Sequence, residues 1–289
     1  MKRILITGEN SYIGTNLERH LERFSDRYAV ETLAMIGHTP DEYDFHGADA
    51  VVHVAAIVHK KETAETIPLY DAVNRDLALA VAKRAKDAGV KQFILFSTMS
   101  VYGMETGVIT KDTAPAPKTL YGRSKLGAER AVAALSDDAF KVTILRPPMV
   151  FGKGAKGNYR RLVALTKRLP LLPDFPNRRS LVSIETLCEA IRGYIDEPCP
   201  GVFFPQEAEP VSTTALMERI AIGQGKPVRK TKLFNPAIRL LRACTHAGKK
   251  AFGDLVYENL FSLYSSCNIC NSNISTNKSI FKLRNIDCS

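Results

Sequence analysis

Short apolar runs alternate with amphipathic stretches through the first half of the chain. Residues 2–7, 50–56 and 92–98 each hold a run of mostly apolar side chains, and each run ends in small or polar residues. Between these runs, apolar side chains recur at helical spacing over residues 13–24 and 77–88. Strands that are apolar without alternation are typical of parallel sheets covered by helices on both faces.

This alternation predicts an α/β fold with a Rossmann-type, doubly wound parallel sheet. We expect residues 1–150 to form this nucleotide-binding domain, with segments near 180–195 returning to it, and residues 151–261 to form a smaller C-terminal substrate lobe. Residues 262–289 contain no Ala, Gly, Val, Pro or Glu and are rich in Asn, Ser and Cys. We interpret them as an atypical tail, either disordered or read in a shifted frame.

A glycine-containing turn directly follows the first apolar run. Gly8 and Gly14 flank Ser11, and an amphipathic helix is predicted to begin at this turn. A strand, a glycine turn and a helix in this order bring backbone N–H groups and the positive helix end against a pyrophosphate. The turn therefore predicts a dinucleotide site, and an ordinary tight strand-to-helix turn is the alternative.

Tyr121 and Lys125 are four residues apart in a predicted helix, so both side chains share one face. A neighbouring ammonium favours the phenolate, so we expect Lys125 to lower the pKa of Tyr121 and make it a general base. Thr98 ends a predicted strand at the edge where open α/β sheets bind ligands. The three side chains are therefore predicted to converge. The alternative is chance spacing on a solvated helix.

The chemistry-bearing positions occur as ordered motifs. They are Thr7-Gly8-x-x-Ser11-x-x-Gly14, His53-x-Ala55-Ala56, Val73-Asn74, Phe96-Ser97-Thr98-Met99-Ser100-Val101-Tyr102-Gly103, Tyr121-x-x-x-Lys125 and Leu145-Arg146-Pro147-Pro148-x-Val150-Phe151-Gly152. Together they resemble the extended short-chain dehydrogenase/reductase family, the NAD-dependent nucleotide-sugar epimerases and dehydratases, over roughly residues 1–260. Within it the chain is most similar to bacterial UDP-glucose 4-epimerase-like proteins encoded with surface-polysaccharide genes.

The resemblance implies an NAD-dependent 4-epimerase acting on UDP-glucose and UDP-galactose or their N-acetyl forms. It implies Thr98, Tyr121 and Lys125 as the catalytic residues, with Thr98 also touching the substrate beside Asn158 and Arg179. The implied cofactor-binding residues, besides Tyr121 and Lys125, are Gly8, Ser11, Tyr12, Ile13, Gly14, Asp44, Phe45, Ala55, Ala56, Asn74, Pro147 and Pro148. An NAD(P)H-dependent reductase or dehydrogenase of a nucleotide-linked keto sugar, or a non-catalytic regulatory member, are the alternatives.

Two positions depart from the family pattern. Ala34 occupies the place where an acidic residue usually holds the adenosine ribose. NAD is therefore favoured only by the resemblance, and NADP stays open. Met99 and Ser100 follow Thr98, where the family's dehydratases carry Asp-Glu. Dehydration needs that added acid and base, so we do not expect it.

The formal net charge of +10 suits a substrate with two phosphates. We expect no nucleic-acid partner, no stable membrane insertion and a cytoplasmic location, with a homodimer as one alternative for the assembly. The basic amphipathic stretch at 236–243 is interpreted as a helix packed on its own lobe, with contact to an anionic membrane surface as the alternative. We expect no metal site, since Cys267, Cys270 and Cys288 lack a fourth ligand nearby.

Overall fold

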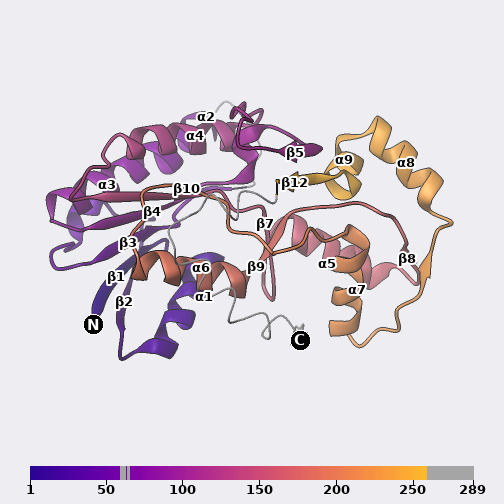
Figure 1. Ribbon diagram of the computed structural model, residues 1–289, viewed down its shortest axis with the longest axis horizontal. Helices are drawn as coiled ribbons and strands as arrows, with labels where there is room; N and C mark the ends of the chain where they lie inside the picture. The colour runs from indigo at the N-terminus through magenta and orange to yellow at the C-terminus, as the bar shows by residue number, and fades with distance from the viewer. Residues whose placement is uncertain (59–62, 64–65, 259–289) are drawn as a thin grey trace. The chain divides into compact units, whose positions relative to one another are not determined.

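A computed structural model describes residues 1–58, 63 and 66–258 (Figure 1). The chain forms two compact units. The first unit comprises Met1–Gly103, Ala114–Pro147 and Ile184–Pro205. The second comprises Met104–Thr113, Pro148–Ser183 and the described residues from Gln206 onward. Residues 104–113 thus group with the second unit, although the division drawn from sequence put them in the first. The predicted tail at 262–289 lies outside the described residues.

The first unit contains a six-stranded sheet in the order β10-β6-β4-β3-β1-β2, and every neighbouring pair is parallel. This confirms the predicted doubly wound parallel sheet. The strands are β1 (Lys2–Thr7), β2 (Tyr28–Leu33), β3 (Ala50–His53), β4 (Gln92–Phe96), β6 (Lys141–Leu145) and β10 (Gly201–Phe203).

Helices cover both faces of this sheet (Figure 1). On one face lie α2 (Thr66–Asp71), a π-helical turn η3 (Ala72–Asp76), α3 (Leu77–Asp87) and α4 (Leu120–Ala133). On the other face lie α1 (Tyr12–Leu21) and α6 (Ile184–Asp196), which contact each other. Short 3₁₀ turns complete the unit: η1 (Glu22–Phe24), η2 (Pro40–Glu42) and η4 (Met99–Tyr102).

The main core lies between the sheet and α3 and α4. Its strand side chains, such as Phe93, are fully buried, and α3 offers Ala82 and Ala85 to them. Small side chains on the helix let it approach the sheet closely, and each large apolar side chain buried here contributes about 1.5–3 kcal/mol. Helix α3 ends as the sequence predicts: Gly89 has a φ of +80°, and its N–H donates to the carbonyl of Lys86.

The second unit is built from short strand pairs and helices. Its strands pair as β5 (Gly107–Ile109) with β12 (Leu255–Tyr257), β7 (Met149–Phe151) with β9 (Leu181–Ser183), and β8 (Leu172–Pro173) with β11 (Lys230–Thr231). Its helices are α5 (Asn158–Arg168), α7 (Thr213–Gly223), α8 (Asn235–Cys244) and α9 (His246–Phe252).

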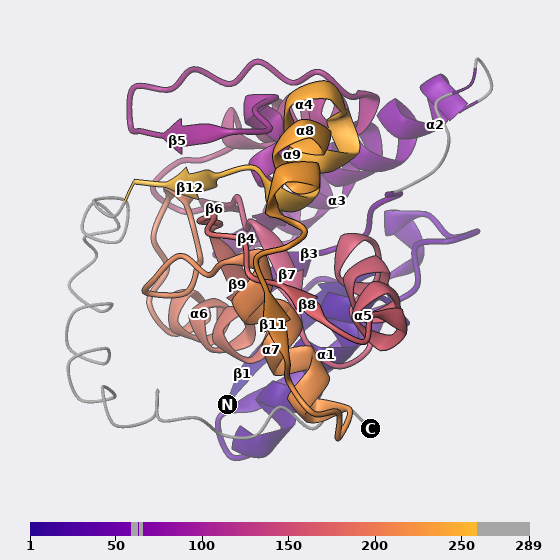
Figure 2. The ribbon, with the colours of Figure 1, turned by 90° about the vertical axis from the view of Figure 1, so that its right-hand side faces the viewer.

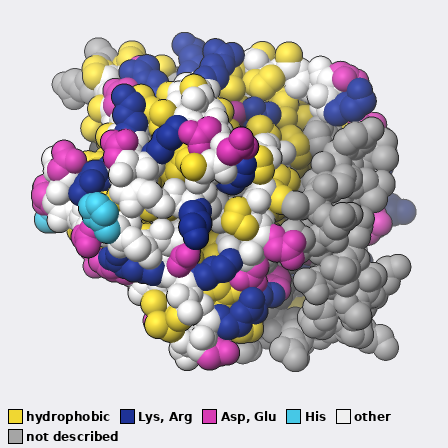
Figure 3. Space-filling view, turned by 60° about the vertical axis from the view of Figure 1, so that its left-hand side comes forward, with side chains coloured by type: hydrophobic (Ala, Val, Ile, Leu, Met, Phe, Trp, Pro, Cys, Tyr) yellow, Lys and Arg dark blue, Asp and Glu magenta, His cyan; other side chains and the backbone are white. Residues whose placement is uncertain are grey.

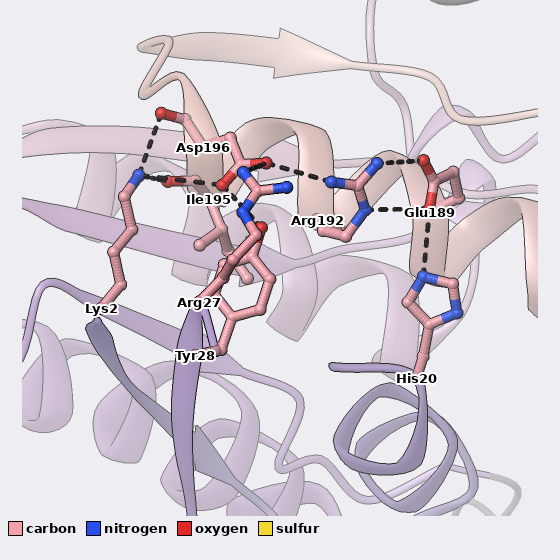
Figure 4. Close-up of polar contacts among 8 residues, drawn as sticks. All are labelled: Lys2, His20, Arg27, Tyr28, Glu189, Arg192, Ile195 and Asp196. Atoms are coloured by element: carbon pink, nitrogen blue, oxygen red, sulfur yellow. Dashed lines mark hydrogen bonds and ion pairs between the residues drawn. The ribbon is translucent and has the colours of Figure 1, made fainter. Parts of the chain in front are cut away.

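Polar contacts join the distant helix α6 to the first two strands (Figure 4). The ammonium of Lys2 donates to the carbonyl oxygens of Ile195 and Asp196 at 2.7 and 3.0 Å. These carbonyls end the helix, where a cation is favourable. The phenol of Tyr28 donates to the Asp196 carboxylate at 2.6 Å, and Arg27 donates to the same carboxylate at 3.0 Å.

A second pair of contacts fixes the middle of α6. Glu189 lies 3.1 Å from the imidazole of His20 on α1 and also accepts from Arg192 (Figure 4). Hydrogen bonds from His20 and Arg192 hold the pKa of Glu189 near 2. The C-terminal end of α6 is therefore bound to β1 and β2, and the middle of the helix is bound to α1.

His53 ends β3 as a fully buried side chain. Its Nδ1 lies 2.8 Å from the Thr7 hydroxyl, and its ring stacks on Phe93 with centroids 5.9 Å apart. Burial, together with the charge of Lys125, lowers its pKa to about 3. The imidazole is therefore neutral in the folded protein.

Because His53 is buried as a neutral imidazole, the free energy of unfolding should decrease in acid. The unfolded chain binds a proton on His53 below pH about 6.5 and the folded chain does not until about 3, so stability falls as pH decreases across that window. In a His53→Asn variant, the free energy of unfolding should depend less steeply on pH, by at most the contribution of one proton bound on unfolding. Denaturant titrations over this window measure it, and the exposed His38→Asn variant is the control. Equal slopes for His53→Asn and the parent would contradict this assignment.

Candidate functional site

The turn after β1 lies directly against the turn after β3. Gly8 has a φ of +92°, and a Cβ placed there would come within 3.0 Å of the backbone nitrogen of Ala55. Only glycine satisfies both the left-handed backbone and this close approach. The predicted cofactor-flanking residues Ala55 and Ala56 thus stand beside the predicted phosphate turn.

Helix α1 begins immediately after this turn. The Ser11 hydroxyl caps it by accepting from the Gly14 N–H at 3.0 Å, and a Cβ on Gly14 would lie 2.7 Å from that hydroxyl. The first turn, which starts with Tyr12 and Ile13, carries no acidic side chain. The uncompensated positive end of α1 therefore fits a pyrophosphate. Ser11, between the two glycines of the turn, is the N-cap residue of α1.

The residues predicted to contact the adenosine are Asp44 and Phe45, and Ala34 occupies the place of the usual acidic residue. Ala34 follows β2, and its carbonyl accepts from the phenol of Tyr43 at 2.6 Å. The exposed Asp44 carboxylate accepts from the backbone of His46 at 3.0 Å. The side chain of Phe45 is fully buried in the core. The whole Phe45 residue, backbone included, is 0% exposed.

Helix α4 is packed closely onto the turn that follows β4. Thr98 caps η4, with its hydroxyl accepting from the Ser100 N–H at 3.1 Å. A Cβ on Gly122 would lie 2.9 Å from the Ser100 carbonyl oxygen, so this glycine permits the approach. Tyr121, in the first turn of α4, lies close enough to Thr98 for the Thr98 hydroxyl to lower the pKa of its phenol. The structure thus brings these two predicted residues together.

Lys125 lies one turn after Tyr121 on α4. Its side chain is 1% exposed, and its ammonium donates to the carbonyl of Phe96 at 2.7 Å. Burial lowers the pKa of Lys125 to about 8, while Glu129 acts in the opposite direction. Lys125 is thus fixed to the end of the strand that carries Thr98.

The expected lowering of the Tyr121 pKa is not what this structure shows. Burial raises the pKa of Tyr121 to about 12, and the Thr98 hydroxyl offsets only part of the increase. The reason is that Tyr121 is only partly exposed, so its charged form is poorly solvated, while the ammonium of Lys125 donates to the Phe96 carbonyl.

Asn74 connects the loop after β3 to α4. It is fully buried in the π-helical turn, and its Oδ1 accepts from the Ile57 N–H at 2.9 Å. Its Nδ2 donates to the Ile57 carbonyl at 3.2 Å and to the Ser124 hydroxyl at 3.0 Å. Its amide therefore holds the backbone next to Ala56 at a fixed distance from the helix of Tyr121.

A buried ionic network under the site was not predicted from the sequence. The Glu129 carboxylate accepts from Arg146 at 3.0 and 2.5 Å and from the Ser97 hydroxyl. Arg146 also donates to the phenol of Tyr102 at 2.8 Å. Two sequence signals could have found it: Glu129 is four residues beyond Lys125 on one helix face, and Arg146 follows an apolar strand.

Removing one partner of this buried pair should cost about 3–5 kcal/mol in the free energy of unfolding, because the other charge stays buried. Glu129→Gln and Arg146→Met should each show this loss in urea titrations. The double variant should be more stable than their summed losses predict, and Lys111→Ala, in an exposed pair with Asp112, should change little. Additive losses would contradict a coupled pair.

The remaining predicted residues fall at the unit boundary or in the second unit. Pro147 belongs to the first unit, and its carbonyl accepts from the Met99 N–H at 3.0 Å. Pro148 starts a segment of the second unit. Asn158 is the first residue of α5, and Arg179 donates to the Gly253 carbonyl at 2.8 Å. Burial lowers the pKa of Arg179.

No cluster of three or more His, Cys, Asp or Glu side chains that could hold a metal occurs within the described part of the chain. The cysteines considered as metal ligands, Cys267, Cys270 and Cys288, lie outside it.

The raised pKa of Tyr121 can be measured in the chain without nucleotide. Up to pH about 10 the parent and Tyr121→Phe should give the same ultraviolet tyrosinate titration, because Tyr121 ionises only near 12. Any transition that the variant lacks should therefore appear above the ordinary tyrosine range. Loss of a transition near neutral pH would show instead that Lys125 activates the phenol by itself.

Comparison with known proteins agrees with this geometry. The model of the NAD dependent epimerase/dehydratase family matches residues 4–201. UDP-glucose 4-epimerase of Vibrio cholerae is 36% identical in an alignment of 252 positions that covers 78% of this chain and 77% of that protein. The chain therefore belongs to the NAD dependent epimerase/dehydratase family.

Solved structures share the fold. UDP-glucuronic acid 4-epimerase from Bacillus cereus, in complex with NAD, has a TM-score of 0.66 at 19% identity and covers 88% of this chain and 87% of its own. A dTDP-4-dehydrorhamnose reductase from Clostridium acetobutylicum has a TM-score of 0.70 at 18% identity and covers 96% and 99%. Both epimerases and reductases thus use this architecture.

Proposed function

We propose that the chain is an NAD-dependent 4-epimerase of a UDP-linked hexose, of the UDP-glucose/UDP-galactose type or its N-acetyl forms. The observation that carries the proposal is the placement of Thr98, Tyr121 and Lys125 at one strand end: Tyr121 and Lys125 lie one turn apart on α4, and Lys125 donates to the Phe96 carbonyl, two residues before Thr98, at 2.7 Å. This group stands at the carboxyl end of β4, in the same unit as the glycine turn after β1. Such edges of open α/β sheets are where nucleotides bind.

Each side chain has a defined role in this reaction. Thr98 hydrogen-bonds the C4 hydroxyl of the sugar, and Tyr121 takes its proton. Lys125, whose ammonium donates to the Phe96 carbonyl, would also donate to the ribose of the bound cofactor and stabilise the phenolate once it forms. When bound, NAD would accept the hydride, and its positive charge would favour ionisation of the phenol. The rest of the site orients the sugar so that the hydride returns to the opposite face.

Epimerisation is favoured over related chemistries by two observations. Met99 and Ser100 follow Thr98, and neither side chain can act as the added acid and base of a dehydratase. The 36% identity to a UDP-glucose 4-epimerase covers most of both chains. We further propose that Asn158 and Arg179 bind the nucleotide sugar and that Pro147 and Pro148 lie beside the nicotinamide. We also propose that the enzyme acts in the cytoplasm and supplies sugars for surface polysaccharide. A homodimer is one alternative for its assembly.

An isotope experiment separates this function from its main alternative. Purified protein should interconvert UDP-glucose and UDP-galactose, or the N-acetyl pair, without added reductant. Deuterium placed at C4 of the sugar should stay with the sugar, because the hydride is returned within one turnover. Mass spectrometry of the product measures this retention.

A reductase of a nucleotide-linked keto sugar would consume NAD(P)H in proportion to product and lose the label to free cofactor. That result would overturn the epimerase proposal. The matched variant is Tyr121→Phe, which should lower turnover by roughly 10²–10⁴-fold with little change in nucleotide-sugar binding. Normal turnover of Tyr121→Phe would end the assignment of Tyr121 as the base.

A further inference from the structure

Helix α8 turns an apolar face to solvent. Only one of its side chains, Ile238, is buried, against Phe175 and Phe252. The helix therefore packs on its own unit, as interpreted from the sequence, but through a narrow contact. Its outward positions are almost all apolar, with Leu240 66% exposed, and Leu233 just before the helix is 80% exposed. The exposed apolar side chains on and before α8 are Leu233, Phe234, Pro236, Ala237, Leu240, Leu241, Ala243 and Cys244.

The chain around this helix is strongly basic. Residues 226–250 contain eight of the 40 Lys and Arg residues and none of the 30 Asp and Glu residues, so they supply eight of the ten net positive charges. The eight are Lys226, Arg229, Lys230, Lys232, Arg239, Arg242, Lys249 and Lys250. Helices α8 and α9 contact each other and face the viewer in Figure 2.

Few of these charges are neutralised within the protein. Lys230 pairs with Glu218 at 3.2 Å, and Arg242 pairs with Asp254 at 3.4 Å. The other six form no ion pair with a carboxylate among the residues that the structure describes. On the face drawn in Figure 3, by contrast, acidic and basic side chains are interspersed.

We propose that the exposed apolar face of α8, with the basic residues of α8 and the adjoining α9 (Arg239, Arg242, Lys249 and Lys250), together the α8 surface, docks on a bilayer with anionic headgroups. An amphipathic helix with apolar residues outward and Lys or Arg around it lies in the interface of such a bilayer. Helix α8 has 10 residues, and the described residues hold no helix that is long and apolar enough to cross a membrane. The association is therefore peripheral and compatible with a chain that does not insert.

Charge complementarity selects this occupant over a second copy of the chain. A symmetric contact through α8 would place one basic segment against another, and like charges at an interface oppose association. Anionic lipid instead supplies the missing negative charge and an apolar layer for Leu233, Leu240 and Leu241. The inference does not depend on the proposed reaction.

Vesicle co-sedimentation of the full chain tests the proposal. The protein should sediment with mixed phosphatidylcholine–phosphatidylglycerol vesicles and stay in solution with phosphatidylcholine alone. Binding should weaken as salt is raised, because the attraction is electrostatic. Leu240→Glu and Arg239→Glu should each lower the partition coefficient by about tenfold or more.

Two variants serve as matched controls. Ile36→Glu places the same charge at another apolar side chain that is 95% exposed, and Lys83→Glu makes the same charge reversal at an exposed position on α3. Both should bind the mixed vesicles like the parent. Thermal melting of all four variants verifies folding, because each site lies at the surface.

Three outcomes would overturn the proposal. One is equal binding to both kinds of vesicle, and the second is no binding to either. The third is an equal loss in the control variants, since net charge alone would then explain binding. A concentration-dependent dimer that Leu240→Glu dissociates, without vesicle binding, would assign the α8 surface to a second copy instead.

Discussion

The buried Glu129–Arg146 ion pair is the constraint on which the candidate site depends. Glu129 lies on α4 one turn after Lys125, and it binds Ser97, the residue before Thr98. Arg146 follows β6 and completes the pair at 2.5 Å. Helix and strand ends are therefore fixed by charge in a region with little water, where an unpaired charge is costly. This network therefore fixes α4, which carries Tyr121, against the strand end that carries Thr98.

Much of the fold and part of the site could be predicted from local sequence. Continuous apolar runs define parallel strands, and Gly8 and Gly14 mark a turn whose close contacts exclude a side chain. Strands β2, β6 and β10 were not among the predicted strands, and β10, with only three residues, is recognised only through its pairing with β6. The partner of Glu129 is likewise nonlocal, since 17 residues separate it from Arg146.

The electrostatic state of the site was the least predictable feature. A spacing of four residues correctly placed Tyr121 and Lys125 on one helix, but it contained no information on burial or on competing acceptors. The Phe96 carbonyl accepts from Lys125, and burial governs the Tyr121 pKa. The net charge of +10 was related to a substrate with two phosphates. However, eight of the ten net positive charges come from residues 226–250 and not from the glycine turn after β1.

In the proposed reaction, the chain keeps its NAD bound, and the cofactor is reduced and then reoxidised within each turnover. The most direct measurement is mass spectrometry of the nucleotide released when the purified protein is denatured. The account predicts NAD, retained at close to one molecule per chain. Release of NADP, or a chain that retains no nucleotide and binds it only from solution, would contradict the claim.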